Sequence, residues 1–218
     1  TGQDCSNCPT AHEVVASLKE QYGDAVVAVA VHATSVFGIP EGDPRGGLML
    51  PDGNVYLSQW ANPDNVSLPT GVVNRRGGLC DYSKWSTTVR DALAEDTQVQ
   101  LSIEADSVVG KDSIAIRVHL EPGVTVNAKL QLWVTENGIV ARQRNGRQTD
   151  RKYVHNHVYR GAVNGVGGEE VSLQKDMFLD FERGVQIKSE WNVENLSVVG
   201  FVYTEADGVL QAVECEVK

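Results

Sequence analysis

The stretch TGQDCSNCPTAHEVV, Thr1–Val15, determines how the rest of the chain is interpreted. Cys5 and Cys8 stand three residues apart, and Pro9 follows directly. Proline is well tolerated in the first turn of a helix, because its missing N–H is not needed there. Apolar residues then recur at helical spacing, so we predict a helix over Pro9–Tyr22 that begins just after the cysteine pair.

A CxxC pair at the start of a helix has a chemical logic. The helix dipole and the unpaired N–H groups of the first turn favour a thiolate there. We therefore assign Cys5 as the candidate nucleophile and Cys8 as the thiol that resolves a mixed disulfide. Asp4 works against this assignment, because a neighbouring carboxylate disfavours a thiolate. A disulfide that is only structural is the alternative.

A zinc knuckle requires a second pair of ligands at a similar spacing. The other two cysteines, Cys80 and Cys215, are isolated in the sequence. His12 follows Cys8 by four residues and supplies a third ligand at most. The sequence therefore favours redox chemistry over a metal site, and a disulfide between Cys80 and Cys215 is a further alternative. We predict no metal and no cofactor.

Composition excludes several classes of function. The 218 residues carry a net charge of −10, which opposes binding to nucleic acid. No cluster of Lys and Arg stands out in the sequence, so we expect no docking on an anionic membrane. The longest apolar run, Ala25–Val31, is too short to span a bilayer.

The first 95 residues alternate between helix and strand patterns. After the first helix we predict a buried strand at Ala25–Ala33 and an insertion at Thr34–Gly53. A short helix at Asn54–Ala61, a short strand at Gly71–Asn74 and an amphipathic helix at Ser83–Leu93 follow. This order, with Pro69 just before a strand, is that of the thioredoxin fold. Pro69 occupies the position of that fold's cis-proline, so we assign Leu68 to orienting an extended substrate peptide.

From about Thr97 the chain contains strand patterns separated by turn formers. The predicted strands are Gln98–Glu104, Ser113–Leu120, Ala128–Thr135, Tyr153–Arg160, Glu170–Phe181, Val185–Trp191, Leu196–Thr204 and Val209–Val217. They predict an antiparallel, immunoglobulin-like β-sandwich. The fold class is thus α/β plus all-β, with a truncated thioredoxin-like domain at residues 1–95 and the sandwich at residues 96–218.

The segment YVHNHVYR, Tyr153–Arg160, contains a second group of chemically capable residues. In a continuous strand, His155 and His157 point to one face together with Tyr153 and Tyr159. An HxH pair is a known metal-ligand spacing, but it needs a third ligand. We therefore interpret Tyr153, His155, His157 and Arg160 as a ligand-orienting or structural cluster.

Four segments together resemble one family: TGQDCSNCPTAHE, LPTGVVNR, YVHNHVYRGAVNGVGGE and VVGFVYTEADGVLQAVE. The family is the 28-kilodalton outer-membrane protein family of the Bacteroidetes, whose members are often lipid-anchored. The resemblance implies an exported protein of the cell envelope, in the outer membrane or the periplasm. It also implies an apolar strand before TGQ, so that the first sheet lacks its central strand unless another segment fills the gap.

Two functions follow as expectations. The first is thiol–disulfide exchange on a protein thiol or disulfide substrate, which makes the chain a candidate oxidoreductase. The second is a non-catalytic binding or structural lipoprotein whose sandwich engages a ligand or partner. In both, we expect membrane association only through a lipid anchor outside this sequence.

Overall fold

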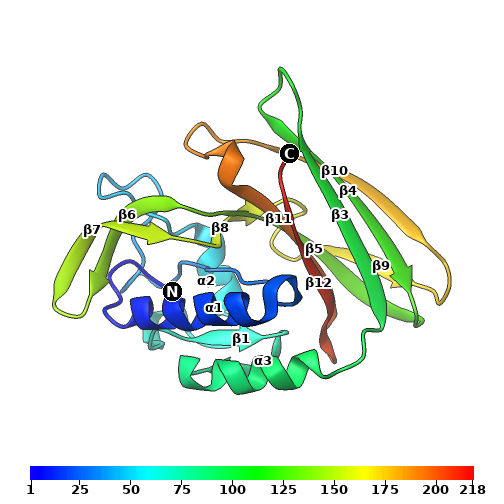
Figure 1. Ribbon diagram of the computed structural model, residues 1–218, viewed down its shortest axis with the longest axis horizontal. Helices are drawn as coiled ribbons and strands as arrows, with labels where there is room; N and C mark the ends of the chain where they lie inside the picture. Colours follow the sequence, from blue (N-terminus) through cyan, green and yellow to red (C-terminus); the bar gives the residue numbers. More distant parts are fainter. The chain divides into compact units, whose positions relative to one another are not determined.

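A computed structural model describes residues 1–218 (Figure 1). The fold is mixed α/β with mostly antiparallel strands. Its helices are α1 (Cys8–Tyr22), α2 (Pro51–Leu57) and α3 (Trp85–Leu93). Its strands are β1 (Gly71–Val73), β2 (Arg76–Cys80), β3 (Val99–Ser107), β4 (Ser113–Pro122), β5 (Val126–Glu136), β6 (Ile139–Asn145), β7 (Gln148–His155), β8 (Val158–Ala162), β9 (Glu169–Leu173), β10 (Leu179–Gln186), β11 (Leu196–Thr204) and β12 (Gly208–Glu216). None of the helices is long and apolar enough to cross a membrane.

The chain forms two compact units. The first unit combines Thr1–Ala94 with Asn137–Tyr159, and the second combines Glu95–Glu136 with Arg160–Lys218. The sequence-based division placed all residues after 95 in the second domain. In the structure, the hairpin formed by β6 and β7 instead belongs with the N-terminal residues, because its inner face hydrogen-bonds to the segment before α1.

Helices α1 and α3 lie close to their predicted positions, whereas α2 begins three residues before its predicted start at Asn54. α1 begins at Cys8 with Pro9 in its first turn, and the N–H of Gly23 closes its last turn. The predicted strand over Ala25–Ala33 is wrong in detail. This segment is extended but forms only a single parallel bridge, between Ala30 and Val158. A regular strand needs a continuous row of partners, whereas the other backbone hydrogen bonds of this segment go to Thr1 and Gly23.

The first unit contains two small antiparallel sheets, β1–β2 and β6–β7. Asn74 and Arg75 both have positive φ angles and form the turn between β1 and β2. The residues Arg76–Gly78, whose two glycines are typical of a turn, instead lie within β2. The β6–β7 hairpin was not predicted as a pair of strands.

The second unit contains two antiparallel sheets with an apolar core. One sheet has the order β10-β4-β3, and the other has the order β12-β11-β5-β8 with β9 also paired to β5. Apolar residues alternate along β4, and Ile114, Ile116, Val118 and Leu120 are buried, as the period of two residues in a strand requires. The alternation in β5 buries Leu130, Leu132 and Val134 in the same way.

Two predicted strands are each interrupted in the structure. The pattern over Glu170–Phe181 forms β9 and β10, with a loop between them. The pattern over Tyr153–Arg160 is divided between β7 and β8, because His157 has a φ of 56°. A left-handed residue cannot continue a strand, so the alternation of side chains is reset there.

Candidate functional site

Cys5 and Cys8 form a disulfide at the start of α1, with Cα atoms 5.5 Å apart. Cys8 is the first residue of the helix, and Asn7 provides no side-chain cap to the first turn. Both cysteines are buried, with 1% of Cys5 and 0% of Cys8 exposed. An attacking thiolate must reach a sulfur atom, so this burial decides how the pair can react.

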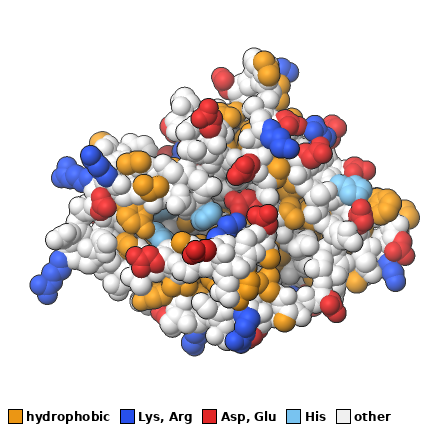
Figure 2. Space-filling view, viewed as in Figure 1, with side chains coloured by type: hydrophobic (Ala, Val, Ile, Leu, Met, Phe, Trp, Pro, Cys, Tyr) orange, Lys and Arg blue, Asp and Glu red, His pale blue; other side chains and the backbone are white.

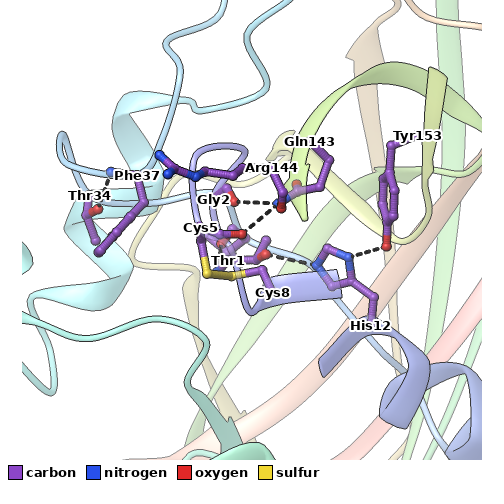
Figure 3. Close-up of a disulfide and its surroundings, with 11 residues drawn as sticks. Thr1, Gly2, Cys5, Cys8, His12, Thr34, Phe37, Gln143, Arg144 and Tyr153 are labelled. Carbon is purple, nitrogen blue, oxygen red and sulfur yellow. Dashed lines mark hydrogen bonds between the residues drawn. A yellow bond between two sulfur atoms is a disulfide. The ribbon is translucent and has the colours of Figure 1, made fainter. Parts of the chain in front are cut away.

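β6 covers the backbone of the cysteine loop from one side (Figure 3). The buried Gln143 amide donates hydrogen bonds to the carbonyl oxygens of Gly2, at 3.2 Å, and Cys5, at 2.9 Å. The N–H of Arg144 donates to the carbonyl of Gln3 at 2.8 Å. This strand therefore holds the loop that contains Cys5 in a closed arrangement.

The insertion at Thr34–Gly53 also forms hydrogen bonds to the loop that contains Cys5. The side chain of Gln3 accepts a hydrogen bond from Leu48 N–H at 2.9 Å and donates one to Gly46 O at 2.8 Å. The N–H of Asp4 donates to Phe37 O at 2.8 Å. The residues before Cys5 are thus fixed by hydrogen bonds to two segments that are distant in the sequence.

Asp4 does not face the disulfide as a lone carboxylate. Its Oδ1 lies 2.7 Å from the Arg142 guanidinium, and its Oδ2 lies 3.9 Å from that of Arg45. The two cations offset the negative charge that the sequence placed beside Cys5. The pairing also joins β6 to the loop, adding to the hydrogen bonds from Gln143.

The peptide bond between Leu68 and Pro69 is cis. Both residues are half-buried, just before β1. Their assignment to substrate orientation remains a prediction.

A second cluster lies in the first unit, where α1 meets β7. His12 is hydrogen-bonded through Nδ1 to Tyr153 Oη and through Nε2 to Thr1 Oγ1, both at 2.9 Å (Figure 3). The ring of His155 lies 4.9 Å from that of Tyr153 and 5.5 Å from that of His32. The sequence did not predict this cluster, because no local pattern indicates that β7 packs against α1.

Burial keeps these imidazoles neutral. It lowers the pKa of His155 to about 4, and only a hydrogen bond to Arg142 O opposes this shift. Burial also lowers the pKa of His12 to about 4 and that of His32 well below its usual value. Both ring nitrogens of His32 are buried, and a backbone hydrogen bond to Ala30 is the one contact that opposes the shift in its pKa. The cluster is therefore a neutral aromatic contact at physiological pH.

The group predicted over Tyr153–Arg160 does not assemble as one face. Tyr153 and His155 join the histidine cluster, whereas the hydroxyl of Tyr159 donates to Asp52 at 2.7 Å. His157 lies in the bend between β7 and β8.

Arg160 belongs to the second unit. Its Nε lies 3.1 Å from Glu136 Oε2, and its guanidinium stacks over the ring of Trp191. It therefore forms a buried ion pair with Glu136. Its assignment to orienting a ligand remains a prediction.

No group of three or more His, Cys, Asp or Glu residues is arranged to hold a metal ion. Cys80 and Cys215 are free thiols, so the disulfide considered between them is not formed.

Comparison with known proteins identifies the family. The model of the outer membrane protein family Omp28 matches residues 56–218. The chain belongs to this family. It is therefore an exported protein of the cell envelope, as the sequence resemblance implied. No curated protein sequence matches the chain.

Two solved structures from Porphyromonas gingivalis are similar to this chain. HBP35 of Porphyromonas gingivalis is similar over 100% of this chain and 73% of its own, with a TM-score of 0.77 and 16% identity. A domain of the outer membrane lipoprotein Omp28 from the same organism covers 57% of this chain and 91% of its own, with a TM-score of 0.42 and 23% identity. At 16% identity, the likeness to HBP35 shows a shared fold alone.

Proposed function

We propose that this Omp28-family protein is a non-catalytic binding or structural protein of the outer membrane, in which Cys5–Cys8 is a structural disulfide. The observation that carries this proposal is the burial of both cysteines under β6 and the insertion. A protein substrate cannot bring a thiolate to either sulfur while these contacts are in place.

We extend the proposal to the domain types. The first unit is a thioredoxin-like domain whose active-site loop has been closed by the β6–β7 hairpin. The second is an immunoglobulin-like sandwich that is available for a ligand or partner. A lipid anchor outside these residues holds the chain at the membrane, as in the Porphyromonas gingivalis relative described as a lipoprotein.

The accessibility of the disulfide tests the proposal. The chain has four cysteines, of which Cys80 and Cys215 are free, so alkylation of thiols labels two sites before reduction and four after it. We expect dithiothreitol to reduce Cys5–Cys8 at least about a hundredfold more slowly in the folded protein than in urea, because reduction must wait for an opening reaction.

Gln143→Ala provides a matched test of the closing contacts. Loss of a buried donor to Gly2 and Cys5 destabilises the closed loop by about 1–3 kcal/mol. Reduction in the folded state should therefore be faster by about tenfold or more. The control is Arg144→Ala on the same strand, where the side chain is exposed and the rate should not change. Equal rates in the two variants would contradict the proposed closure.

Thiol–disulfide exchange is the second candidate. It is favoured by the position of Cys8 in the first turn of α1, where no side-chain cap competes for the N–H groups. This activity predicts rapid reduction of the folded protein and catalysed reduction of insulin that is lost in Cys5→Ser. The structural proposal predicts neither result, so the same preparation distinguishes the two functions.

A further inference from the structure

The β6–β7 hairpin differs sharply in charge from the rest of the chain. Residues 137–159, which we call the basic hairpin, contain five of the chain's 19 Lys and Arg residues and one of its 29 Asp and Glu residues. The basic hairpin therefore carries a net charge of +4, and the remaining residues together carry −14. All five cations lie within residues 142–152, so the sequence itself contains this cluster, and the expectation that no Lys and Arg cluster stands out overlooked it.

Most of this positive charge faces solvent. Arg142 is only 21% exposed and pairs with Asp4, which accounts for one cation of the basic hairpin. Arg144, Arg147, Arg151 and Lys152 are all exposed. Figure 2 shows Lys and Arg side chains protruding where Figure 1 places β6 and β7. The exposed cations are thus accessible to an anionic binding partner that is not part of this chain.

Exposed apolar side chains accompany the charges. Val140 on β6 and Val154 on β7 are opposite each other in the antiparallel register. They are 63% and 50% exposed, so the two paired valines form a small apolar patch on this pair of strands. Cations beside exposed aliphatic residues are the combination that binds at a lipid interface, where headgroup phosphates lie next to acyl chains.

We propose that the basic hairpin docks the protein on an anionic phospholipid surface. Arginine guanidinium groups bind phosphate oxygens with two donors each, and Val140 and Val154 enter the boundary between headgroups and acyl chains. The negative charge elsewhere is repelled by the same surface, so the protein binds with the basic hairpin toward the membrane. Screening limits this attraction to about 8–10 Å at physiological salt.

The location of the protein favours lipid over an acidic protein as the partner. An outer-membrane protein already lies next to a phospholipid leaflet, and the lipid anchor of the proposed function would keep the hairpin close to it. Weak attraction then suffices to orient the first unit, since binding of an attached group is effectively intramolecular. The proposal adds a direct membrane contact to the anchor, and it holds whether or not Cys5–Cys8 exchanges.

Flotation of the 218-residue chain with vesicles tests the proposal. We expect binding to vesicles that contain phosphatidylglycerol, weak binding to pure phosphatidylcholine, and release at high salt. The triple variant Arg147→Glu, Arg151→Glu, Lys152→Glu should lower partitioning by about a hundredfold or more, because each cation near an anionic surface contributes about a factor of five. Val140→Ser with Val154→Ser should lower it at unchanged charge.

The control reverses the same amount of charge elsewhere. Lys84→Glu, Lys111→Glu, Lys175→Glu alters three exposed lysines outside the basic hairpin and should retain most of the binding. Circular dichroism establishes that each variant is folded. Equal losses in the two triple variants, or binding that does not depend on phosphatidylglycerol, would overturn the proposal. Self-association that depends on the basic hairpin, without vesicle binding, would instead assign this surface to a second copy and also overturn it.

Discussion

His155 shows how one buried side chain makes the first unit sensitive to pH. It is 2% exposed and contacts the rings of His32 and Tyr153. His12 lies on its other side, with ring centroids 6.4 Å apart. Protonation of His155 buries a positive charge whose one hydrogen-bond acceptor is the carbonyl oxygen of Arg142. The cluster is therefore stable only while its imidazoles are neutral.

We expect acid to destabilise the protein through His155. The unfolded residue binds a proton near pH 6.5, whereas the folded one binds it only near pH 4. The unfolded state holds more protons between these values, so stability decreases as the pH falls from about 6.5 to 4, by roughly 3 kcal/mol for this residue. Urea unfolding at a series of pH values measures the loss.

His155→Gln isolates this contribution from that of the carboxylates. The variant should be less stable at neutral pH, since it disrupts the ring contacts, but its stability should depend less on pH between 6.5 and 4. The control is His119→Gln, on the exposed surface of β4, where the pKa is raised by Asp180 and the effect of acid has the opposite sign. An unchanged slope in His155→Gln would show that the imidazole is not held neutral.

At the scale of elements, local patterns predicted what depends on nearby residues. α1 follows from Pro9 and a helical apolar pattern, and the buried face of β4 follows from period two. The hairpin of β6 and β7 did not follow, because its partners are the residues before α1. The strand predicted over Tyr153–Arg160 failed because nothing nearby indicates that His157 adopts a positive φ angle.

For the candidate site too, the local pattern was predictable and the contacts with distant segments were not. The spacing of Cys5 and Cys8 predicted a pair at a helix start, and the structure has that disulfide. Its burial was not predictable, because the covering residues come from the insertion and from β6. Sequence thus identifies which groups are chemically capable. Contacts between distant segments decide whether these groups can be reached.

The packing of α2 gives a prediction for an element. Gly53 lies inside this helix, where alanine is ordinarily better than glycine by about 1 kcal/mol. Here an added Cβ would overlap the carbonyl oxygen of His32, which is backbone and cannot easily move. Gly53→Ala should therefore destabilise the protein by about 1–3 kcal/mol, measured by urea unfolding.

Gly167→Ala is the matched control for this substitution. No atom lies within contact distance of an added Cβ at Gly167, and its φ angle is not positive. This variant should leave stability unchanged or raise it slightly, because alanine restricts the unfolded chain. If Gly53→Ala stabilised the protein to a similar extent, α2 would not pack closely against the His32 segment.

At the scale of the whole molecule, the two units differ in how their cores are assembled. Every residue of the apolar core cluster lies in Glu95–Glu136 or Arg160–Lys218. The second unit therefore has a complete core without the basic hairpin. The first unit needs Gln143 for the cysteine loop and Val158 for the bridge to Ala30, and both come from the C-terminal half of the sequence.

This difference predicts unequal folding of the separated units. Residues 95–218 with the basic hairpin replaced by a short glycine-rich turn should fold cooperatively, since β5 and β8, which the hairpin connects, are neighbouring strands of one sheet. Residues 1–94 alone should lack a cooperative unfolding transition, because the removed strand supplied buried donors. Circular dichroism with urea unfolding measures both. A cooperative transition in residues 1–94, with Cys5–Cys8 still resistant to dithiothreitol, would show that the basic hairpin covers the first unit without completing it, and its main role would then be the contact with lipid.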